Sequence, residues 1–563
     1  MIPKNKGRIL EFVWLAGAIL FTLWLAGPRM NHSLWTDEQS TLLGPVHGSF
    51  VHDLPEGQAL DVIPAPIWES PHWIETVWRY DSTNQHFLCS ILSRASLNVW
   101  QRLFDKEPWE FSEPVLRLFP LLAVLIGIVI WFQLAKSLFG QSTALVFVTL
   151  LSFHPWVIRF GTEMRGYAYV FLLLPIVLFL AIKALDRPRW RLWTGFAVAQ
   201  FLLLYSWPGM ALAVVGINLA LLFILRRKRL TENGAARVKF KRWFVANVLT
   251  LSLLAPFIVP TIYQIIPFIQ EGSPRQEFNS NWWPNLFAHF AGGMDWTDWG
   301  DHSKENPWFH SIESLLQTHT ALVFFCLVTF AGFFFFGWFR ALRRFATPVL
   351  LATVVCLSNI AILVLIALIS DIHLFPWYFF PFLPLVLLCV AHGLNQCLAP
   401  LPFQWRLPLH ALWILSMLFF SWPKLNAMRS KPIGPLREAV VEVRGKIPDP
   451  RDFRTSGLLI AHVGGSAFAY DALGWLVFSD YVKGTDAKHF LGLVQLMSLA
   501  DRTNSELYVI AGLRSDMETK IPEVYKWLEN KEAFEHFKTL HGTEVATVRE
   551  LYHYKGGFFD PLR

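Results

Sequence analysis

Residues 9–40 read ILEFVWLAGAILFTLWLAGPRMNHSLWTDEQS, an apolar run followed directly by a polar stretch that carries Asp37 and Glu38. The run Ile9–Ala26 has about 18 residues, which is the length that crosses the hydrocarbon core of a membrane once. We expect an uncleaved anchor, because the run is long for the core of a signal peptide. A signal peptide cleaved near Ala26 is the alternative, and both place the next loop outside.

The acidic pair that follows this run therefore lies close to a membrane surface. A carboxylate that has lost part of its hydration there is a stronger base than one in water. The alternative is a solvated loop in which Thr36 or Asp37 caps a short helix beginning at Glu38.

The composition indicates a multi-pass membrane protein. The 563 residues are 54% hydrophobic and only 16% charged, and the mean hydropathy is +0.38. A soluble domain has roughly 25% charged residues. The net charge of +7 does not indicate nucleic-acid binding, because the basic residues are concentrated in a few loops. The five cysteines have neither metal-type nor disulfide-type spacing, so they do not identify the redox compartment.

Hydropathy predicts about 11 spans. They are Ile9–Ala26, Leu116–Leu138, Ser142–Phe153, Tyr167–Leu185, Leu192–Ser206, Gly209–Leu225, Phe244–Tyr263, Ala321–Trp338, Val349–Ile369, Trp377–Leu394 and Leu407–Ser421. Basic residues are concentrated in alternate connections, at 183–191, 226–242 and 340–344. The positive-inside rule therefore places the N-terminus inside and the C-terminal region outside.

Three regions outside the spans have recognisable character. The first outer loop, Gly27–Ser112, contains the segment Asn84–Phe104, whose apolar positions recur at helical spacing and predict a helix in the membrane interface. The second long outer loop covers 264–317. Residues 423–563 alternate strand-like and helix-like runs, which predicts a small α/β domain behind a membrane domain at 1–422. We expect a docking or capping role for this domain. The fold class is thus mainly α, a polytopic helical bundle with an added α/β domain.

Five polar stretches are predicted to face the same side of the membrane, where charged residues are costly and usually functional. They are Asp37-Glu38, 113–117, 159–167, 295–301 and 373–378. Three of these residues also have a purely structural interpretation. The side chains of Arg117 and Arg165 could extend to the lipid headgroups without a further role, and Glu163 could form a structural ion pair with Arg165.

Some residues of these stretches are predicted to have no chemical role. Asp295, Asp298 and Asp301 lack histidine at metal-ligand spacing, so they predict a solvated loop in which each acid is dispensable. His373 is predicted to be a packed interfacial residue.

The ordered set of motifs resembles the GT-C class of membrane glycosyltransferases, in particular the family 39-like group with protein O-mannosyltransferases and aminoarabinose lipid A transferase. The matching stretches are WTDEQS, SEPVLRLFPLLAVLIG, AKSLFG and HPWVIRFGTEMRGYAY, and the last is similar to the family's Glu-x-Arg-x-Tyr stretch. The dense match covers residues 9–185. The chain departs from the pattern at Asn84-Gln85-His86, where the family has prolines, and at Trp377, which replaces the family's arginine before Tyr378.

The resemblance implies transfer of a sugar, with inversion, from a polyprenyl-phosphate donor to an acceptor hydroxyl on the outer face of a bacterial inner membrane. The acceptor class stays open among protein, lipid and glycan. We expect Asp37 to be the base, and Glu38 to orient it or contact the acceptor.

The remaining site residues are assigned from the same reasoning. The donor phosphate is expected at Arg165 first and Arg117 second, with Tyr167 and Tyr378 as further ligands. Glu163 and Glu113 are expected to orient these groups. No residue is assigned to a metal, and a divalent metal requirement is left open.

Two other functions compete with this interpretation. A transporter or flippase of lipid-linked sugars would place its charges near the middle of the bilayer, whereas here they lie at span ends. A purely structural membrane subunit gives no reason for so many charged residues at one face.

Overall fold

The structure is a computed structural model of the whole chain. It describes residues 4–51, 67–78, 86–231, 233–271, 281–297, 306–344, 375–444, 458–463, 477–479 and, with short gaps, 493–557. Helices lie at all predicted spans except the ninth, Val349–Ile369, which lies outside the described residues. The helices of the bundle are α1 (Lys4–Met30), α5 (Glu113–Phe139), α6 (Gln141–Phe153), α7 (Pro155–Gly161), α8 (Tyr167–Asp186), α9 (Trp190–Ser206), α10 (Ala211–Thr231), α11 (Asn233–Glu271), α14 (Ile312–Arg344), α16 (Leu383–Leu398) and α17 (Phe403–Ser430).

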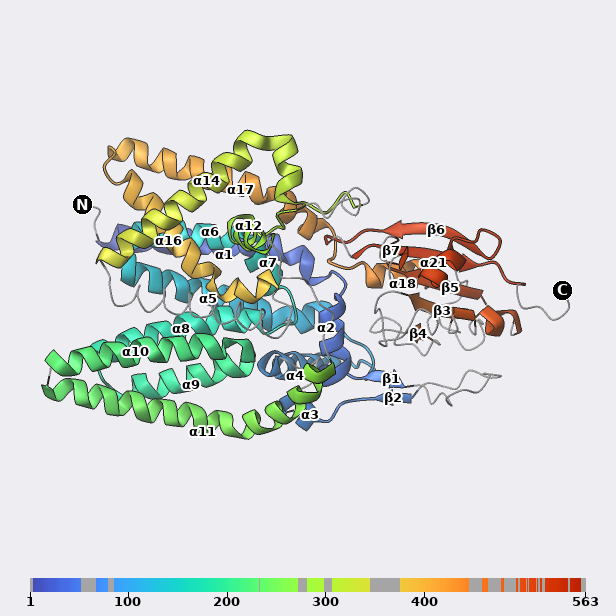
Figure 1. Cartoon of the computed structure of the whole chain (residues 1–563), viewed down its shortest axis with the longest axis horizontal. Helices are drawn as coiled ribbons and strands as arrows, with labels where there is room; N and C mark the ends of the chain where they lie inside the picture. The colour runs from blue at the N-terminus through green and yellow to red at the C-terminus, as the bar shows by residue number, and fades with distance from the viewer. Residues whose placement is uncertain are drawn as a thin grey trace.

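Within the described residues, six helices are long and apolar enough to cross a membrane, or seven if the bent pair α6–α7 is one span. The chain is therefore a multi-pass membrane protein, while the count of eleven spans stays a prediction. The N-terminus lies at the end of the bundle away from the C-terminal sheet, and so does the junction of α10 with α11 (Figure 1).

The bend between α6 and α7 follows Phe153, where the third predicted span also ends. The two helices meet at 62°, because Pro155 has no N–H to continue the ladder of α6. The imidazole Nδ1 of His154 accepts a hydrogen bond of 3.2 Å from the N–H of Trp156 and so caps α7. This bend starts the segment that carries residues 159–167.

Small residues allow two helices of the bundle to lie in backbone contact. A Cβ placed on Gly337 of α14 would lie 2.0 Å from the carbonyl oxygen of Cys389, and one on Gly393 of α16 would lie 1.9 Å from that of Phe333. Glycine at both positions is therefore required for this packing, as is typical of membrane helices.

Short elements lie between the long helices in the sequence. They are α2 (Thr36–Thr41), a π-helical turn (Leu42–Val46), β1 (Ser49–Val51), β2 (Ile67–Glu69), α3 (Trp73–Trp78), α4 (Phe87–Leu103), α12 (Trp282–Gly292) and 3-10 turns at Pro208–Met210 and Pro376–Phe382. Helix α4 lies within the segment Asn84–Phe104 that periodicity predicted to be helical. It packs against α5 and α9. Helix α2 lies where the bundle meets the C-terminal region (Figure 1).

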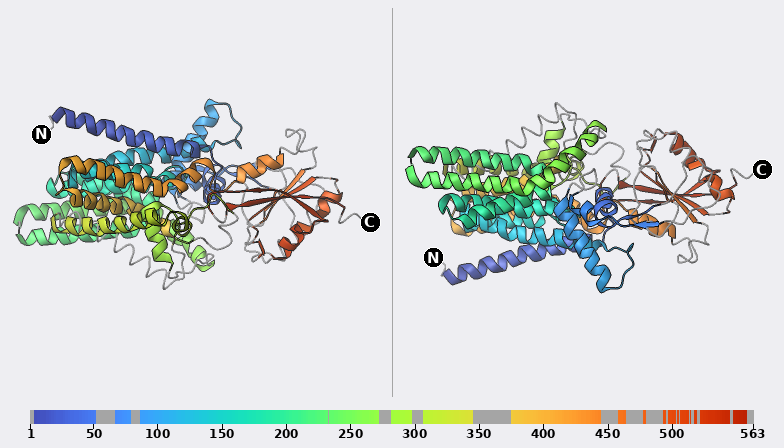
Figure 2. Two further views of the ribbon diagram at one scale, coloured as in Figure 1. Left: turned by 90° about the horizontal axis from the view of Figure 1, so that it is seen from above. Right: turned by 90° about the horizontal axis from the view of Figure 1, so that it is seen from below.

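The C-terminal region contains a five-stranded mixed sheet in the order β4-β3-β5-β7-β6. Its described elements are α18 (Leu436–Arg444), β3 (Leu458–Val463), β4 (Val477–Ser479), β5 (Glu506–Ala511), α21 (Pro522–Leu528), β6 (Phe534–Leu540) and β7 (Arg549–Tyr554). Strands β4, β3 and β5 are parallel, and β7 and β6 are added antiparallel. Figure 2 shows the sheet nearly edge-on, with α18 and α21 on opposite sides.

Helix α21 ends at Leu528, and Phe534 begins β6 and buries its ring in the sheet core. Helix α17 continues to Ser430 and so crosses the expected domain boundary at residue 423. We therefore propose that the membrane domain extends to the end of α17.

Candidate active site

The stretch that carries the acidic pair folds into the short helix α2, which begins at Thr36. The N–H of Trp35 donates to Glu38 Oε2 at 3.3 Å, and the N–H of Gln39 donates to the carbonyl of Trp35 at 3.0 Å. The helix therefore begins two residues earlier than the solvated-loop alternative requires. The cap comes from Glu38 inside the first turn, in agreement with the preference of helix N-termini for acids.

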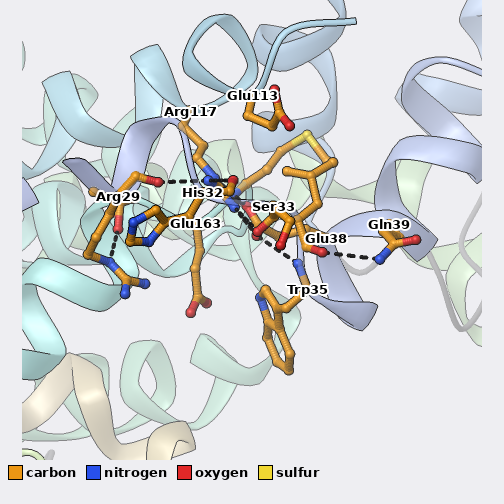
Figure 3. A network of polar contacts seen from close by, with 12 residues as sticks. Arg29, His32, Ser33, Trp35, Glu38, Gln39, Glu113, Arg117 and Glu163 are labelled. Carbon is orange, nitrogen blue, oxygen red and sulfur yellow. Dashed lines mark hydrogen bonds and ion pairs between the residues drawn. The ribbon is translucent and has the colours of Figure 1, made fainter. Parts of the chain in front are cut away.

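Glu38 is locked in a buried ion pair with Arg117 of α5 (Figure 3). Arg117 donates from Nε to Glu38 Oε1 at 2.9 Å and from Nη2 to Oε2 at 2.6 Å, the bidentate geometry that guanidinium and carboxylate favour. The N–H of Met164 donates a further hydrogen bond to Oε1 at 2.8 Å. Glu38 is completely buried and Arg117 is only 3% exposed.

The remaining N–H groups of Arg117 are bound to the backbone after α1. Nη1 donates to the carbonyls of Arg29 at 2.8 Å and His32 at 2.6 Å, and Nη2 donates to that of Ser33 at 3.2 Å. All the donors of a guanidinium are thus used. The expectation that Arg117 binds a donor phosphate is corrected: Arg117 ties α1, α2 and α5 together, and its burial also excludes snorkelling to headgroups. For the same reason Glu38 has no free oxygen to orient Asp37 or contact an acceptor.

Asp37, one residue earlier, lies in a different environment. Its carboxylate is 39% exposed, and its closest cation is Arg165, with Nη2 at 3.5 Å from Oδ2. Nη1 of Arg165 lies 3.5 Å from the backbone carbonyl of Asp37, which is a long contact for a hydrogen bond. Nε of Arg165 is buried and has no hydrogen-bond partner in the part of the chain that the structure describes. Arg165 is therefore a guanidinium with donors to spare, next to a carboxylate that water can reach.

Aromatic side chains surround Arg165. Tyr167 lies beneath the guanidinium, with its ring 6.0 Å from the central carbon. Trp207 contacts Tyr167 on one side and Tyr378 on the other, at ring separations of 5.2 Å and 5.8 Å. His86 packs on Tyr167 at 5.4 Å. The structure thus brings Arg165, Tyr167 and Tyr378 together, as their separate motifs predicted.

Gly166 makes this arrangement sterically possible, and the sequence analysis did not single it out. A Cβ at this position would lie 2.2 Å from the carbonyl oxygen of Ser206 and 2.5 Å from Nδ1 of His86. Any larger residue would push the turn away from the end of α9.

Glu163 forms an ion pair with Arg159. The structural alternative, in which Glu163 pairs with Arg165, is therefore wrong. Nε of Arg159 donates to Oε1 of Glu163 at 2.8 Å. The two residues are four apart on the turn of α7, which places them on one face. Burial raises the pKa of Glu163, and the neighbouring Arg159 opposes this shift.

Arg159 also contacts the C-terminal sheet, which the sequence did not predict. Its Nη1 lies 3.1 Å from Oε1 of Glu544 in the loop between β6 and β7, and Lys424 of α17 lies 3.0 Å from the same oxygen. Asn306 donates to the carbonyls of Gly542 and Glu544 at 3.0 Å and 3.1 Å. The loop is therefore docked against the end of the bundle.

Glu113 begins α5 and accepts a hydrogen bond of 2.7 Å from Nη1 of Arg437. The pair joins the start of α5 to α18, so Glu113 stabilises the position of the helix that carries Arg117.

Comparison with known proteins identifies the fold. Residues 102–263 match the family described as dolichyl-phosphate-mannose-protein mannosyltransferase. ArnT from Cupriavidus metallidurans in its apo state is 12% identical, with 98% of each chain covered and a TM-score of 0.54. The chain has the fold of the GT-C membrane glycosyltransferases. Together with the family match, this fold confirms the resemblance stated from the sequence and indicates a glycosyltransferase.

A second structure of ArnT from Cupriavidus metallidurans is bound to undecaprenyl phosphate. It is 13% identical, covers 96% of this chain and 97% of its own, and has a TM-score of 0.51. No curated protein sequence matches the chain.

One loop acid of the GT-C fold described here departs from the sequence-based expectation. Asp295 is 20% exposed and lies 3.1 Å from Nε2 of His289, whose ring stacks on Trp156 at 4.9 Å. Burial alone would raise the pKa of Asp295, but the hydrogen bond and charge of His289 hold it below its usual value. The solvated loop is therefore wrong for Asp295, while Asp298, Asp301 and His373 lie outside the described residues. In the part of the chain that the structure describes, no three His, Cys, Asp or Glu side chains are placed to hold a metal ion.

Proposed function

We propose that the chain transfers a sugar from a polyprenyl-phosphate donor to an acceptor hydroxyl at the outer face of the membrane, with inversion at the anomeric carbon. The observation that carries this proposal is the environment of Arg165, a nearly buried guanidinium. Among the described residues its Nε has no hydrogen-bond partner, and its contact with the carboxylate of Asp37 is 3.5 Å long. Such a group favours an additional anionic ligand, and phosphate fits the planar fork of arginine.

Asp37 is proposed as the general base. Its exposed carboxylate can reach an acceptor hydroxyl, unlike the carboxylate of Glu38, which is completely buried. Asp37 accepts the hydroxyl proton while the acceptor oxygen attacks the anomeric carbon from the side opposite the phosphate. The bond from that carbon to the phosphate oxygen breaks, and the leaving phosphate keeps the electron pair.

Arg165 is proposed to stabilise the charge that develops on the leaving phosphate, and Tyr167 and Tyr378 to donate hydroxyl hydrogen bonds to it. A polyprenyl phosphate is a weak base, so the reaction needs positive charge at the leaving group and no general acid. Arg117 is withdrawn from this set, because its donors are used within the protein.

The proposed orientation puts the N-terminus inside and the C-terminal sheet outside a bacterial inner membrane. Two observations support it: the basic junction of α10 and α11 lies at the same end as the N-terminus, and the acidic pair lies at the opposite end (Figure 1). The charged network lies near the ends of α1, α5 and α7, whereas a transporter places its charges near the bilayer midplane.

The test is to identify lipid bound to the purified protein and then to measure transfer. We expect mass spectrometry to detect a polyprenyl-phosphate sugar in the wild type and much less in Arg165→Ala, with Arg502→Ala as a control on an exposed arginine. Equal amounts of bound lipid in Arg165→Ala and Arg502→Ala would show that Arg165 is not part of the donor site. Movement of a lipid-linked sugar across proteoliposomes without transfer would support the transporter instead.

A further inference from the structure

Asp37 and Arg165 lie within a group of charged side chains. The described carboxylates of this group are Asp37, Glu38, Glu163, Asp295 and Glu544, and its described bases are Arg29, Arg117, Arg159, Arg165 and Lys424. A phosphate that binds one of the paired bases competes with the carboxylate that already contacts that base.

The ion pairs differ in the distance between their nitrogen and oxygen atoms. Glu38 with Arg117, Glu163 with Arg159, and Glu544 with Lys424 are separated by 2.6 Å, 2.8 Å and 3.0 Å.

The pair of Asp37 with Arg165 is the longest of the set, at 3.5 Å, and Asp37 is its most exposed carboxylate. A carboxylate that water can reach loses less when its partner leaves, because water replaces the lost interaction. Among the bases that form an ion pair here, Arg165 is therefore the one that an incoming anion can recruit at the lowest cost.

We propose that the donor phosphate and the carboxylate of Asp37 compete for Arg165, so that phosphate binding frees Asp37 to act as a base. This inference rests on the proposed function, and it orders the reaction: the donor binds before Asp37 can accept a proton from the acceptor. The order prevents Asp37 from activating a hydroxyl when no sugar is present.

The proton and charge balance closes over one cycle. Asp37 takes the acceptor proton, the acceptor oxygen forms the new bond to the sugar, and the phosphate leaves with the electron pair of the broken bond. Arg165 holds the product phosphate, which now carries one more negative charge. Release of the polyprenyl phosphate and loss of the proton from Asp37 to solvent restore the original pair.

The test measures the affinity of undecaprenyl phosphate in detergent for the wild type, Asp37→Asn, Arg165→Gln and the double variant. Competition predicts that Asp37→Asn binds about two- to fivefold more tightly than the wild type, the effect of releasing a half-exposed pair. Arg165→Gln should bind more weakly than the wild type. In the Arg165→Gln background, Asp37→Asn should change nothing.

The double variant separates competition from simple repulsion by a nearby carboxylate, because repulsion would persist without Arg165. Equal gains from Asp37→Asn in both backgrounds would overturn the competition and leave the proposed function intact. Failure of the wild type to bind undecaprenyl phosphate would overturn both proposals. Glu442→Gln, in the partly exposed pair of Glu442 with Lys538, is the control for surface charge and should leave the affinity unchanged. Unfolding temperatures should stay close to that of the wild type, since Asp37 and Arg165 make only long contacts with each other.

Discussion

Two neighbouring carboxylates on α2 have opposite environments. Glu38 faces inward, accepts both arms of Arg117 and the N–H of Met164, and is inaccessible to solvent. The carboxylate of Asp37 is accessible to solvent, and its contact with the nearly buried Arg165 is long. Two adjacent acids in one motif can therefore have different roles. Glu38 fixes the position of α2, and Asp37 remains accessible for a reaction.

Replacing the buried acid should have the largest effect. Glu38→Gln keeps the size of the side chain but leaves Arg117 as a buried charge without a counter-ion, which typically costs about 3–5 kcal/mol of unfolding free energy. Denaturant unfolding in detergent measures this loss, with Asp37→Asn as the matched control one residue away. If both variants unfold like the wild type, the structural role of Glu38 is wrong.

Replacing the exposed acid should affect the rate and leave the fold intact. Asp37→Asn cannot accept a proton, and loss of a general base lowers the turnover by about 10²- to 10⁴-fold. Transfer assays with the copurified lipid-linked sugar measure it. Near-normal turnover of Asp37→Asn would show that Asp37 is not the base, and the proposed difference in role between Asp37 and Glu38 would be wrong.

Arg165→Lys tests the cation on the exposed side of the comparison. Lysine keeps the charge and loses the planar fork, so we expect binding of undecaprenyl phosphate to weaken about tenfold, the effect of losing one hydrogen bond to a charged group. Unchanged affinity would mean that Arg165 serves only as a point charge.

The smallest effect is expected at the docked loop of the C-terminal sheet. Glu544→Gln removes the charge shared by Arg159 and Lys424, while Thr543 keeps its backbone hydrogen bonds to Pro432 and Ile433. Hydrogen exchange at the Thr543 amide should speed up by an amount equivalent to about 1 kcal/mol. Glu442→Gln, which breaks an exposed pair with Lys538, should leave that amide unchanged. Equal exchange in all three proteins would show that Glu544 does not hold the loop.

Sequence reasoning was most accurate where the signal is local. The apolar runs predicted helices at 116–138 and 167–185, and α5 and α8 contain them. The motif order led to the GT-C resemblance, which the fold confirms. It was least accurate for ion pairs: Arg117 was expected to bind phosphate and instead binds Glu38.

The sequence by itself determined that the chain is a membrane protein of this class and that Asp37, Arg165, Tyr167 and Tyr378 belong to candidate stretches. Hydropathy and motif order suffice for this, because burial in a membrane depends on composition over about 20 consecutive residues. Only the tertiary structure decided which acid is locked and which is free. Successive residues of a helix point about 100° apart, so Asp37 and Glu38 meet different neighbours. Their partners come from α5 and from the turn after α7, and no local pattern in the sequence encodes that choice.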